Sequence, residues 1–370
     1  MVEDFSKRVV ILTLTQACNL ACVYCFEHNK TAKKMTLETA IDIIEHEFSG
    51  LKEDAILEID LFGGEPFLEF ELIKQIVSYV ENCKMRDRVI FFADTNGTLI
   101  NDEIKQWLIN HSHNFVCGLS YDGTDFMQDM NRCKSSKLID LQFFQQQYPE
   151  QTIKMTISQN SLPYLAEGVI YLQEKGFEVA CNLAYGIDWG KEEYCVLLER
   201  ELSKLIDYYL ANPNVIACSM LDTDISGVLS DGKKQRYCGA GIDMATYDVD
   251  GKKYPCHLFM PISVGEDKAS RANSIHFFEN EIPNEFLDKK CQDCAIKSIC
   301  PTCYGANYLQ YGNIYMQDDN YCNLQKIIIK ARSYFKGLQW EKGLLNLSDD
   351  EEHILLSSVL KIQKQLQKHE

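Results

Sequence analysis

The sequence lacks four features that would assign a chain to a specialised class of protein. It has no uninterrupted apolar run of the length that a transmembrane helix requires, and its first residues lack the charged and then apolar order of a signal peptide. It has no internal repeat and no low-complexity tract. Cations are also scarce, because 37 Lys and Arg residues stand against 54 Asp and Glu and give a net charge of −17. These absences predict an unexported protein without a membrane span, and they argue against nucleic acid or an anionic membrane as its main partner.

What the chain has in unusual abundance is cysteine, with 16 residues among 370. The hydrophobic content of 46% and the charged content of 25% are those of an ordinary soluble globular protein. A chain of this length can bury one large core, or a core and a smaller satellite domain. Without export, so many thiols indicate metal or redox chemistry in a reducing compartment rather than disulfides. We therefore expect a cytoplasmic protein that binds metal.

Strand-like apolar runs alternate with helix-like stripes over about the first 210 residues. The strands that we predict are 9–14, 56–62, 88–93, 115–119, 152–157 and 178–183. The helices that we predict are 36–48, with Thr36 as N-cap, 70–82, 101–109, 162–174 and 192–211. Strands this apolar that alternate with helices predict a parallel sheet with right-handed crossovers, buried on both faces. A partial (β/α)6 barrel fits better than an open sheet, although periodicity alone cannot decide, and in both cases ligands bind at the carboxyl ends of the strands.

The pattern changes at about residue 213. The segment 213–323 has few helical stripes and is rich in glycine, aspartate and cysteine, and bound metal can order such a segment. Two amphipathic helices, 324–340 and 351–367, then close the chain. The sequence therefore predicts a partial barrel over 1–212, a small cysteine-rich α+β domain over 213–323, and C-terminal helices over 324–370.

Three cysteines, Cys18, Cys22 and Cys25, follow the first predicted strand. Thiolates suit soft metals, and a four-iron cluster needs one ligand for each iron. Three thiolates would therefore leave one iron for a ligand that is not protein. A zinc knuckle, or three unrelated buried thiols, is the alternative that this spacing alone leaves open.

Polar, glycine-containing loops follow the next three strands. Gly63 and Gly64 end the second strand and permit a close approach of backbone to a ligand, and Glu65 adds a carboxylate that could receive an ammonium group. Asn96 follows the third strand and Ser120 follows the fourth. A shared binding rim is the more economical explanation, and a set of unrelated tight turns is the alternative.

These motifs together resemble those of the radical S-adenosylmethionine (SAM) enzymes. The C-x3-C-x2-C motif after the first strand and Gly-Gly-Glu-Pro after the second carry the resemblance. The loop 120–123, Ser-Tyr-Asp-Gly, and the segment 182–189 look like the matching parts of the peptide-modifying branch. Seven later cysteines resemble the SPASM domain of that branch: Cys238, Cys256, Cys291, Cys294, Cys300, Cys303 and Cys322. The resemblance covers about residues 9–322, and two cysteine patterns in the right order make it specific.

The resemblance implies a role for each rim residue. Glu65 and the backbone of the two preceding glycines would hold the ammonium group of SAM. Asn96 and Ser120 lie where the family contacts the methionine carboxylate and the ribose, and the backbone of Tyr24 would meet the adenine. Arg132 is at the position of a cation near the SAM carboxylate, with an exposed arginine as the alternative. One-electron reduction would cleave SAM to methionine and a 5′-deoxyadenosyl radical, which abstracts hydrogen from the substrate.

The resemblance also implies three [4Fe-4S] clusters. The first three cysteines would hold the SAM cluster. Cys238, Cys256 and Cys303 would hold a first auxiliary cluster, and a second would have the full set of Cys291, Cys294, Cys300 and Cys322.

Several positions depart from the family pattern. Cys303 follows Cys300 after two residues where the family usually has three, which makes it the less certain ligand. Met244 stands where some relatives have a further cysteine, so the first auxiliary cluster would be open to the substrate, unless Cys133 or Cys218 completes it. His257 follows Cys256 where sulfatase-maturing relatives have an aspartate base. This histidine could be a general base, with a hydrogen-bonded structural histidine as the alternative.

We predict from this a radical SAM peptide maturase that forms a thioether or carbon–carbon crosslink in a ribosomally made peptide. The alternatives are formylglycine formation in sulfatases, dehydrogenation of a small substrate, or, outside the class, an iron–sulfur or zinc protein for electron transfer or binding. The expected partners are a precursor peptide with a leader and a flavodoxin- or ferredoxin-type electron donor. Because so few residues precede the first strand, the leader would dock on the barrel, on the SPASM surface, or on a separate recognition protein.

Overall fold

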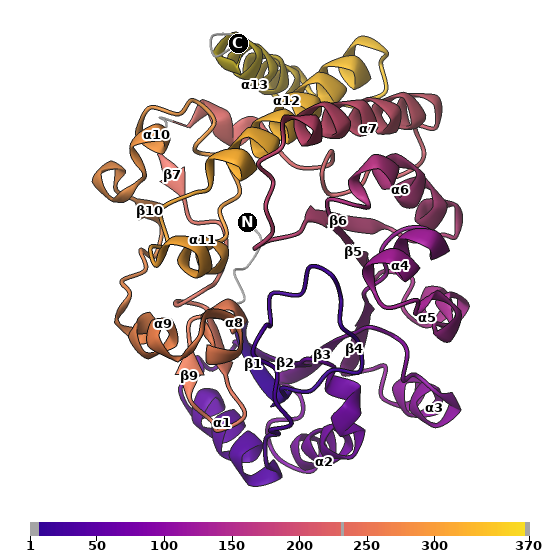
Figure 1. The fold of residues 1–370 in the computed structure, drawn as a ribbon, viewed down its shortest axis with the longest axis vertical. Coiled ribbons are helices and arrows are strands. Elements are labelled where there is room, and N and C mark those ends of the chain that lie inside the picture. The colour runs from indigo at the N-terminus through magenta and orange to yellow at the C-terminus, as the bar shows by residue number, and fades with distance from the viewer. Residues whose placement is uncertain (1–6, 231–232, 367–370) are drawn as a thin grey trace. The chain divides into compact units, whose positions relative to one another are not determined.

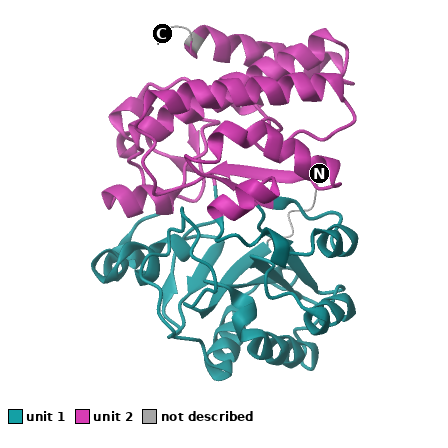
Figure 2. Ribbon diagram, turned by 45° about the vertical axis from the view of Figure 1, so that its right-hand side comes forward, with its two compact units in different colours: residues 1–121, 132–153, 238–277 teal, residues 122–131, 154–237, 278–370 magenta. Residues whose placement is uncertain are grey.

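The protein is seen in a computed structural model, which describes residues 7–230 and 233–366. Figure 1 labels its helices and strands in chain order. The chain forms two compact units, coloured separately in Figure 2. Unit 1 comprises Met1–Tyr121, Arg132–Ile153 and Cys238–Phe277, and unit 2 comprises Asp122–Asn131, Lys154–Tyr237 and Phe278–Glu370.

Unit 1 is built on a six-stranded sheet with the strand order β4-β3-β2-β1-β8-β9. The strands are β1 (Lys7–Thr15), β2 (Ile56–Gly63), β3 (Val89–Thr95), β4 (Phe115–Leu119), β8 (Met244–Tyr247) and β9 (Lys253–Tyr254). Neighbouring strands are parallel from β4 through to β8, and only β9 runs antiparallel to its neighbour. The carboxyl ends of β1 to β4 therefore lie along one edge of the sheet.

Helices bury apolar faces within unit 1. They are α1 (Leu37–Ser49), α2 (Phe70–Glu81), α3 (Asp102–Asn110), α5 (Leu141–Gln147), α8 (Pro261–Val264) and α9 (Glu266–Arg271), with 3-10 turns at Pro66–Glu69, Ser136–Leu138, His257–Phe259 and Ala272–Ser274. Thr36 caps α1, because its hydroxyl accepts a hydrogen bond from the amide of Thr39 at 3.1 Å. The spacing of Ala40, Ile43 and Ile44 turns their side chains to the buried face of that helix.

A buried carboxylate joins distant segments of unit 1. Glu47 on α1 accepts hydrogen bonds from Arg8 at 3.0 Å, Lys253 at 2.7 Å and Tyr247 at 2.5 Å. Burial alone would raise the pKa of Glu47, but these three donors outweigh it and lower the pKa to about 2. The ionised form therefore ties α1 to β1, β8 and β9.

Unit 2 combines helices with short strands. Its helices are α4 (Asp125–Asn131), α6 (Leu165–Glu174), α7 (Glu192–Ala211), α10 (Lys289–Gln292), α11 (Tyr304–Tyr311), α12 (Asp319–Glu341) and α13 (Asp349–Leu366), with 3-10 turns at Leu162–Tyr164, Ser226–Leu229 and Asn284–Phe286. β5 (Ile153–Ile157) pairs with β6 (Val179–Leu183), and β7 (Lys234–Gln235) pairs with β10 (Glu281–Ile282). The long helix α12 packs against both α7 and α13.

The structure confirms the α/β class with a parallel sheet, and each of the six predicted strands and seven predicted helices is present. The membership of the sheet differs from the prediction, because β8 and β9 complete it while β5 and β6 pair with each other. The short helices α4 and α5 were not predicted. The compact units also divide the chain differently from the predicted domain boundaries, which stay a prediction. The predicted end of the last helix, residue 367, lies outside the described residues.

Within residues 7–230 and 233–366, no helix is both long and apolar enough to cross a membrane.

Candidate functional site

The three N-terminal cysteines lie on a loop, residues 16–34, that leaves the carboxyl end of β1 in unit 1. We call it the cysteine loop; in Figure 1 it is the indigo loop beyond β1. Its two ends are held together, since Thr15 forms a β-bridge with Lys34 and the amide of Met35 donates to the carbonyl of Leu14 at 2.8 Å. The loop is therefore anchored at the edge where parallel sheets bind ligands.

Backbone turns present the thiols of the cysteine loop. The amide of Cys25 donates to the carbonyl of Cys22 at 3.1 Å, and the amide of Leu20 donates to the sulfur of Cys18 at 3.4 Å. Burial raises the pKa of Cys18, and the negative charges of Glu65 and Cys25 add to the effect. A cation is what would stabilise such thiolates together, which fits a metal cluster.

The Gly-Gly-Glu-Pro turn after β2 lies directly against the cysteine loop. The amides of Gly64 and Glu65 donate to the carbonyls of Thr15 and Ala17 at 3.1 and 3.0 Å. A Cβ atom at Gly64 would stand 2.3 Å from the Ala17 oxygen and 2.8 Å from the Cys18 Cβ. Glycine is therefore required here by close approach of two backbones, and its amide positions the first cysteine.

Glu65 is a buried carboxylate, 1% exposed, at the base of the cysteine loop. Its Oε1 accepts from the Thr95 hydroxyl at 2.8 Å and the Phe67 amide at 3.2 Å, and its Oε2 accepts from the Asn96 amide at 2.8 Å. Burial raises the pKa of Glu65 to about 7, against the effect of these donors. Two carboxylate oxygens offer about four acceptor positions, so these three donors leave capacity for a cation.

Asn96 and Ser120 follow β3 and β4 at the same edge. The Asn96 side chain donates to Asn19 of the cysteine loop at 2.9 Å, and Asn19 in turn donates to Thr98 at 2.7 Å. The Ser120 amide donates to the Thr95 carbonyl at 3.0 Å. Asn96 thus contacts the cysteine loop, and Ser120 is held against the end of β3, beside Asn96.

Arg132 and Cys133 contact the cysteine loop from another part of the chain. Arg132 is only 8% exposed, so the alternative of an exposed arginine is wrong. Its guanidinium carbon lies 5.5 Å from the centre of the Tyr24 ring, a cation–π contact. The Cys133 sulfur accepts from the Ala21 amide at 3.1 Å.

Two charged residues of the cysteine loop were missed by sequence reasoning. Burial works to lower the pKa of Lys30, but a hydrogen bond to Cys25 and the charges of Cys25 and Cys18 outweigh it and raise the pKa. Glu27 is 6% exposed, its Oε1 has no hydrogen-bond partner among the described residues, and burial raises its pKa to about 7. Their nearness to the thiols in sequence was the only available signal.

His257, the predicted base, also lies in unit 1. Its ring centre is 5.5 Å from that of Phe26, the neighbour of Cys25, and 4.9 Å from that of Phe62, the neighbour of Gly63. The histidine thus lies beside two rings that flank the cysteine loop, tilted by 32° and 30° to them. Its role as a base stays a prediction.

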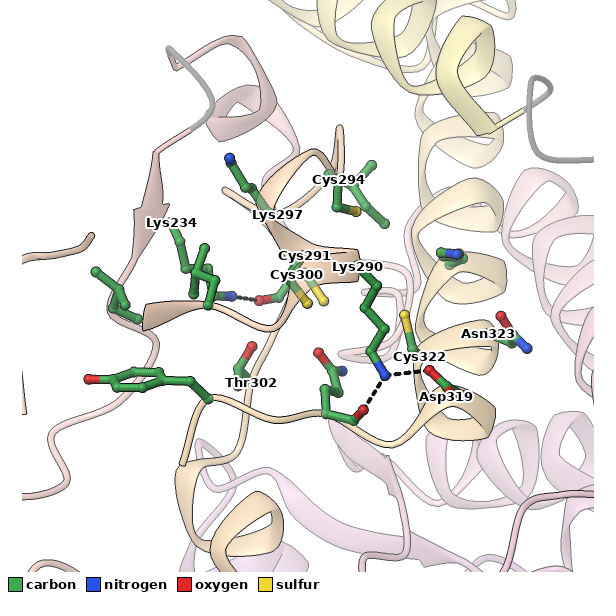
Figure 3. A pocket seen from close by; sticks show the side chains of 16 residues that line it. Lys234, Lys290, Cys291, Cys294, Lys297, Cys300, Thr302, Asp319, Cys322 and Asn323 are labelled. Carbon is green, nitrogen blue, oxygen red and sulfur yellow. Dashed lines mark hydrogen bonds and ion pairs between the residues drawn. The ribbon is translucent and has the colours of Figure 1, made fainter. Parts of the chain in front are cut away.

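A second group of thiols lines a cavity of about 350 Å³ within unit 2 (Figure 3). Cys291 lies on α10, Cys294 and Cys300 follow it, and Cys322 lies in the first turn of α12. Asp318 caps α12, since its carboxylate accepts from the Tyr321 amide at 2.8 Å. Cys294 and Cys300 also pack against an apolar core. We call this cavity the four-thiol pocket.

The four-thiol pocket offers the ligand type of an iron–sulfur cluster, with its thiols largely shielded from water. Burial raises the pKa of Cys291 to about 12 and that of Cys300 to about 11, and the charge of Cys322 adds to both shifts. Within the described residues, no three His, Cys, Asp or Glu side chains gather closely enough to bind a single metal ion. A four-iron cluster holds each thiolate on its own iron, so its ligands stand farther apart than the ligands of one ion.

The remaining predicted ligands are divided between the units. Cys238 and Cys256 lie in unit 1, whereas Cys303 lies in unit 2, where its sulfur accepts from the Ala306 amide at the start of α11. Met244 is the first residue of β8 and pairs with Val9. The set of ligands for a first auxiliary cluster therefore stays a prediction.

Of the two cysteines that could complete that cluster, Cys133 contacts the cysteine loop, as described above. Cys218 is fully buried in unit 2 and hydrogen-bonded to Cys181. None of the sixteen cysteines, all within the described residues, forms a disulfide.

The comparisons with known proteins agree with this geometry. The model of a family described as a 4Fe-4S single cluster domain matches residues 7–157. A cysteine-type anaerobic sulfatase-maturating enzyme of Clostridium novyi is 20% identical over 80% of this chain and 87% of its own length. A radical SAM cyclopropyl synthase, TigE, of Paramaledivibacter caminithermalis is 21% identical over 93% of this chain and 76% of its own length.

These matches support a radical SAM enzyme with a SPASM-type domain. A four-iron cluster and SAM are the cofactors that they support. Another relative, an uncharacterized protein of Methanocaldococcus jannaschii, is 32% identical over 44% of this chain. In that alignment this chain spans 57% of the length of the relative.

Solved structures share the fold of this chain. The structure titled "Native anSMEcpe with bound AdoMet and Cp18Cys peptide" has a TM-score of 0.69 and 18% identity, over 92% of this chain and 100% of that chain. The structure of SuiB of Streptococcus suis bound to the precursor peptide SuiA has a TM-score of 0.55 and 14% identity, over 85% of this chain and 76% of that chain. These similarities support the predicted partial barrel.

Proposed function

We propose that this protein is a radical SAM peptide maturase, which removes a hydrogen atom from a ribosomally made peptide and forms a thioether or carbon–carbon crosslink in it. The observation that carries the proposal is the three-thiol cysteine loop with the buried carboxylate of Glu65 at its base. Three thiolates leave one iron of a four-iron cluster for an outside ligand. A desolvated carboxylate beside that position suits the ammonium group of SAM.

When bound, the cluster would supply the electron that cleaves SAM to a 5′-deoxyadenosyl radical, which takes the hydrogen atom. Cys18, Cys22 and Cys25 would hold the cluster, and Gly64 would keep Cys18 in position. Glu65 would accept from the ammonium group, together with carbonyl oxygens of the glycine turn, because the amides of that turn already donate to the cysteine loop. Arg132, held over Tyr24, would balance the SAM carboxylate.

The later cysteines would bring the number of four-iron clusters to three. Cys291, Cys294, Cys300 and Cys322 would hold one in the four-thiol pocket. Cys238, Cys256 and Cys303 would hold another with an open position that faces the substrate. A crosslink removes two electrons from the peptide, one with the abstracted hydrogen atom, and these clusters would accept the other. A flavodoxin- or ferredoxin-type protein would supply the reducing electrons.

A peptide substrate is supported by the similar structures of anSMEcpe with bound Cp18Cys peptide and of SuiB bound to the precursor peptide SuiA. The net charge of −17 favours a leader peptide with basic residues, by complementarity. Such a leader would dock on this chain or on a separate recognition protein.

Formylglycine formation in a sulfatase is the second candidate. It is favoured by the similarity to the sulfatase-maturating enzyme of Clostridium novyi over most of both chains. Against it stands His257 in place of the aspartate of that group. This histidine, whose ring contacts those of Phe26 and Phe62, is the candidate base in either reaction.

Mass spectrometry of the product separates the two candidates. The reconstituted enzyme is incubated with SAM, a reductant and a cysteine-containing peptide encoded beside its gene, and in parallel with a sulfatase-derived cysteine peptide. Either crosslink removes two hydrogen atoms from the precursor and keeps its sulfur, and a thioether also leaves the cysteine without an alkylatable thiol. Formylglycine formation instead loses the sulfur and gives an aldehyde that reacts with hydrazides. Aldehyde formation with an unchanged precursor would contradict the crosslinking proposal.

A further inference from the structure

The four-thiol pocket contains a buried lysine that none of the motifs includes. Lys234 is on β7, where it pairs with Ile282 of β10, and it is 5% exposed. Its amine donates to the carbonyl oxygen of Cys300. Figure 3 shows this amine directed at Cys300, on the side of the pocket where the sulfurs of Cys291 and Cys300 lie.

Lys234 occupies a position that is costly for a cation. It is 5% exposed and lines the same cavity as Cys291, Cys294 and Cys300. Burying a lysine without an anionic neighbour is strongly unfavourable. An anionic cluster held by these thiols would supply the negative charge that this position requires.

The other lysines of the pocket have different partners. The amine of Lys290 donates to the Gln317 carbonyl and to Asp319. Lys297 donates to the Asn284 side chain at 2.9 Å and to the Gln292 carbonyl, and Figure 3 shows its amine turned away from the sulfurs. Lys297 therefore lines the same cavity without facing the thiols, which makes it a matched control.

We propose that Lys234 is a fixed countercharge for the cluster held by Cys291, Cys294, Cys300 and Cys322, and that it raises the reduction potential of that cluster. The inference rests on the proposed function, because it requires those four cysteines to hold a cluster. Reduction adds one electron from the donor to an already anionic cluster. A buried cation beside the ligands stabilises the reduced form more than the oxidised form, since little water screens the interaction.

The test is a redox titration monitored by electron paramagnetic resonance. It uses the full chain with Cys18, Cys22 and Cys25 changed to alanine, so that only auxiliary clusters contribute. The signal of the four-thiol pocket is assigned as the one that Cys300→Ala removes. In Lys234→Met this signal should titrate at a more negative potential, with the ratio of reduced to oxidised cluster at a fixed potential lowered by roughly tenfold. Lys297→Met should leave the potential unchanged, and Lys234→Arg should restore it.

An unchanged potential in Lys234→Met, with full iron content, would overturn the proposal. If Lys234→Met loses the iron of this cluster, the iron content of Lys234→Arg is measured next. Iron retained in Lys234→Arg supports the need for a positive charge. Equal loss of iron in both variants attributes the effect to the contact with Cys300 and contradicts the proposal. If Cys300→Ala removes neither iron nor signal, the assignment of the cluster itself has failed. That outcome differs from the one in which the cluster is present and its reduction potential does not change in Lys234→Met.

Discussion

The two groups of thiols, the cysteine loop of unit 1 and the four-thiol pocket of unit 2, differ in number and in surrounding charge. The cysteine loop offers three thiols, with the buried carboxylates Glu65 and Glu27 nearby. The four-thiol pocket offers a full set, with Lys234 buried against it and Lys290 at its wall. The cysteine loop therefore has two buried carboxylates, with Lys30, beside an incomplete set of thiols. The four-thiol pocket has a buried lysine and further lysines, with Asp319, beside a complete set.

This difference indicates two uses of the same chemistry. An incomplete set beside carboxylates suits a cluster that binds a cationic ligand such as SAM. A complete set beside lysines suits a cluster that is closed to ligands and only exchanges electrons. Removing a thiol should therefore affect reactivity in the first case and stability in the second.

The largest expected effect comes from removing thiols of each group. Changing Cys18, Cys22 and Cys25 to alanine should abolish 5′-deoxyadenosine formation and lower the iron content from about twelve to about eight per chain, with little change in thermal stability.

Changing Cys291 and Cys300 to alanine should lower the melting temperature by roughly 10 °C, because metal binding orders this segment. Iron analysis and calorimetry measure both effects. Cys83→Ala is the control, because Cys83 lies outside both groups of thiols, two residues after α2 ends. Equal melting temperatures for the two variants would remove the distinction.

Gly64→Ala should lower the rate of 5′-deoxyadenosine formation by about 100-fold or more. The added Cβ would stand 2.3 Å from the Ala17 oxygen and would displace Cys18. Gly337→Ala on α12, where a Cβ meets only Val359 at 3.6 Å, is the control and should be silent. A Gly64→Ala enzyme with the wild-type rate would show that the approach of the two backbones is not needed.

Glu65→Gln should weaken SAM binding by about 10- to 100-fold, measured by calorimetry on the reconstituted protein. Because burial raises the pKa of Glu65 to about 7, the wild-type protein should also lose SAM affinity as the pH falls below about 7 and this carboxylate takes up a proton. The glutamine variant should lack that pH dependence. The control is Glu69→Gln. The Glu69 carboxylate pairs with the exposed Lys34, so this variant should bind SAM as the wild type does. An identical pH profile in both proteins would refute the role of Glu65.

The last prediction concerns the stability that Glu47 gives to the fold of unit 1. Glu47 has its pKa lowered to about 2, so its contribution to stability is present above its unfolded pKa of about 4.5 and is lost as the pH falls from there toward 2. Glu47→Gln should cost about 2 kcal/mol of unfolding free energy at pH 7 and flatten the acid dependence over that range. Chemical denaturation of the iron-free chain at several pH values measures this, and parallel curves for variant and wild type would contradict it.

The elements of the fold were predictable where local patterns decide them. The apolar run of β1 and the stripe of Ala40, Ile43 and Ile44 behind the Thr36 cap are signals of this kind. The pairing of β8 with β1 was not predictable, because more than two hundred residues separate the two strands and β8 has only four residues. Its place in the sheet depends on tertiary contacts that periodicity does not record.

The candidate site was predictable to the extent that motifs name its residues. The spacing of the cysteines and the Gly-Gly-Glu-Pro turn indicated where a cluster and SAM would bind. The contacts of Lys234 and of Cys133 were not predictable, because a single lysine or cysteine carries no spacing pattern. Only the folded chain brings Lys234 to Cys300 and Cys133 to Ala21.

The proposed chemistry begins with a cluster on the cysteine loop that cleaves SAM. Anaerobic reconstitution of the full chain with iron and sulfide, followed by addition of SAM and a low-potential reductant, is the decisive experiment. We expect about twelve irons per chain and the appearance of 5′-deoxyadenosine, which is absent when Cys18, Cys22 and Cys25 are alanine. A protein that takes up only zinc and forms no 5′-deoxyadenosine would contradict it.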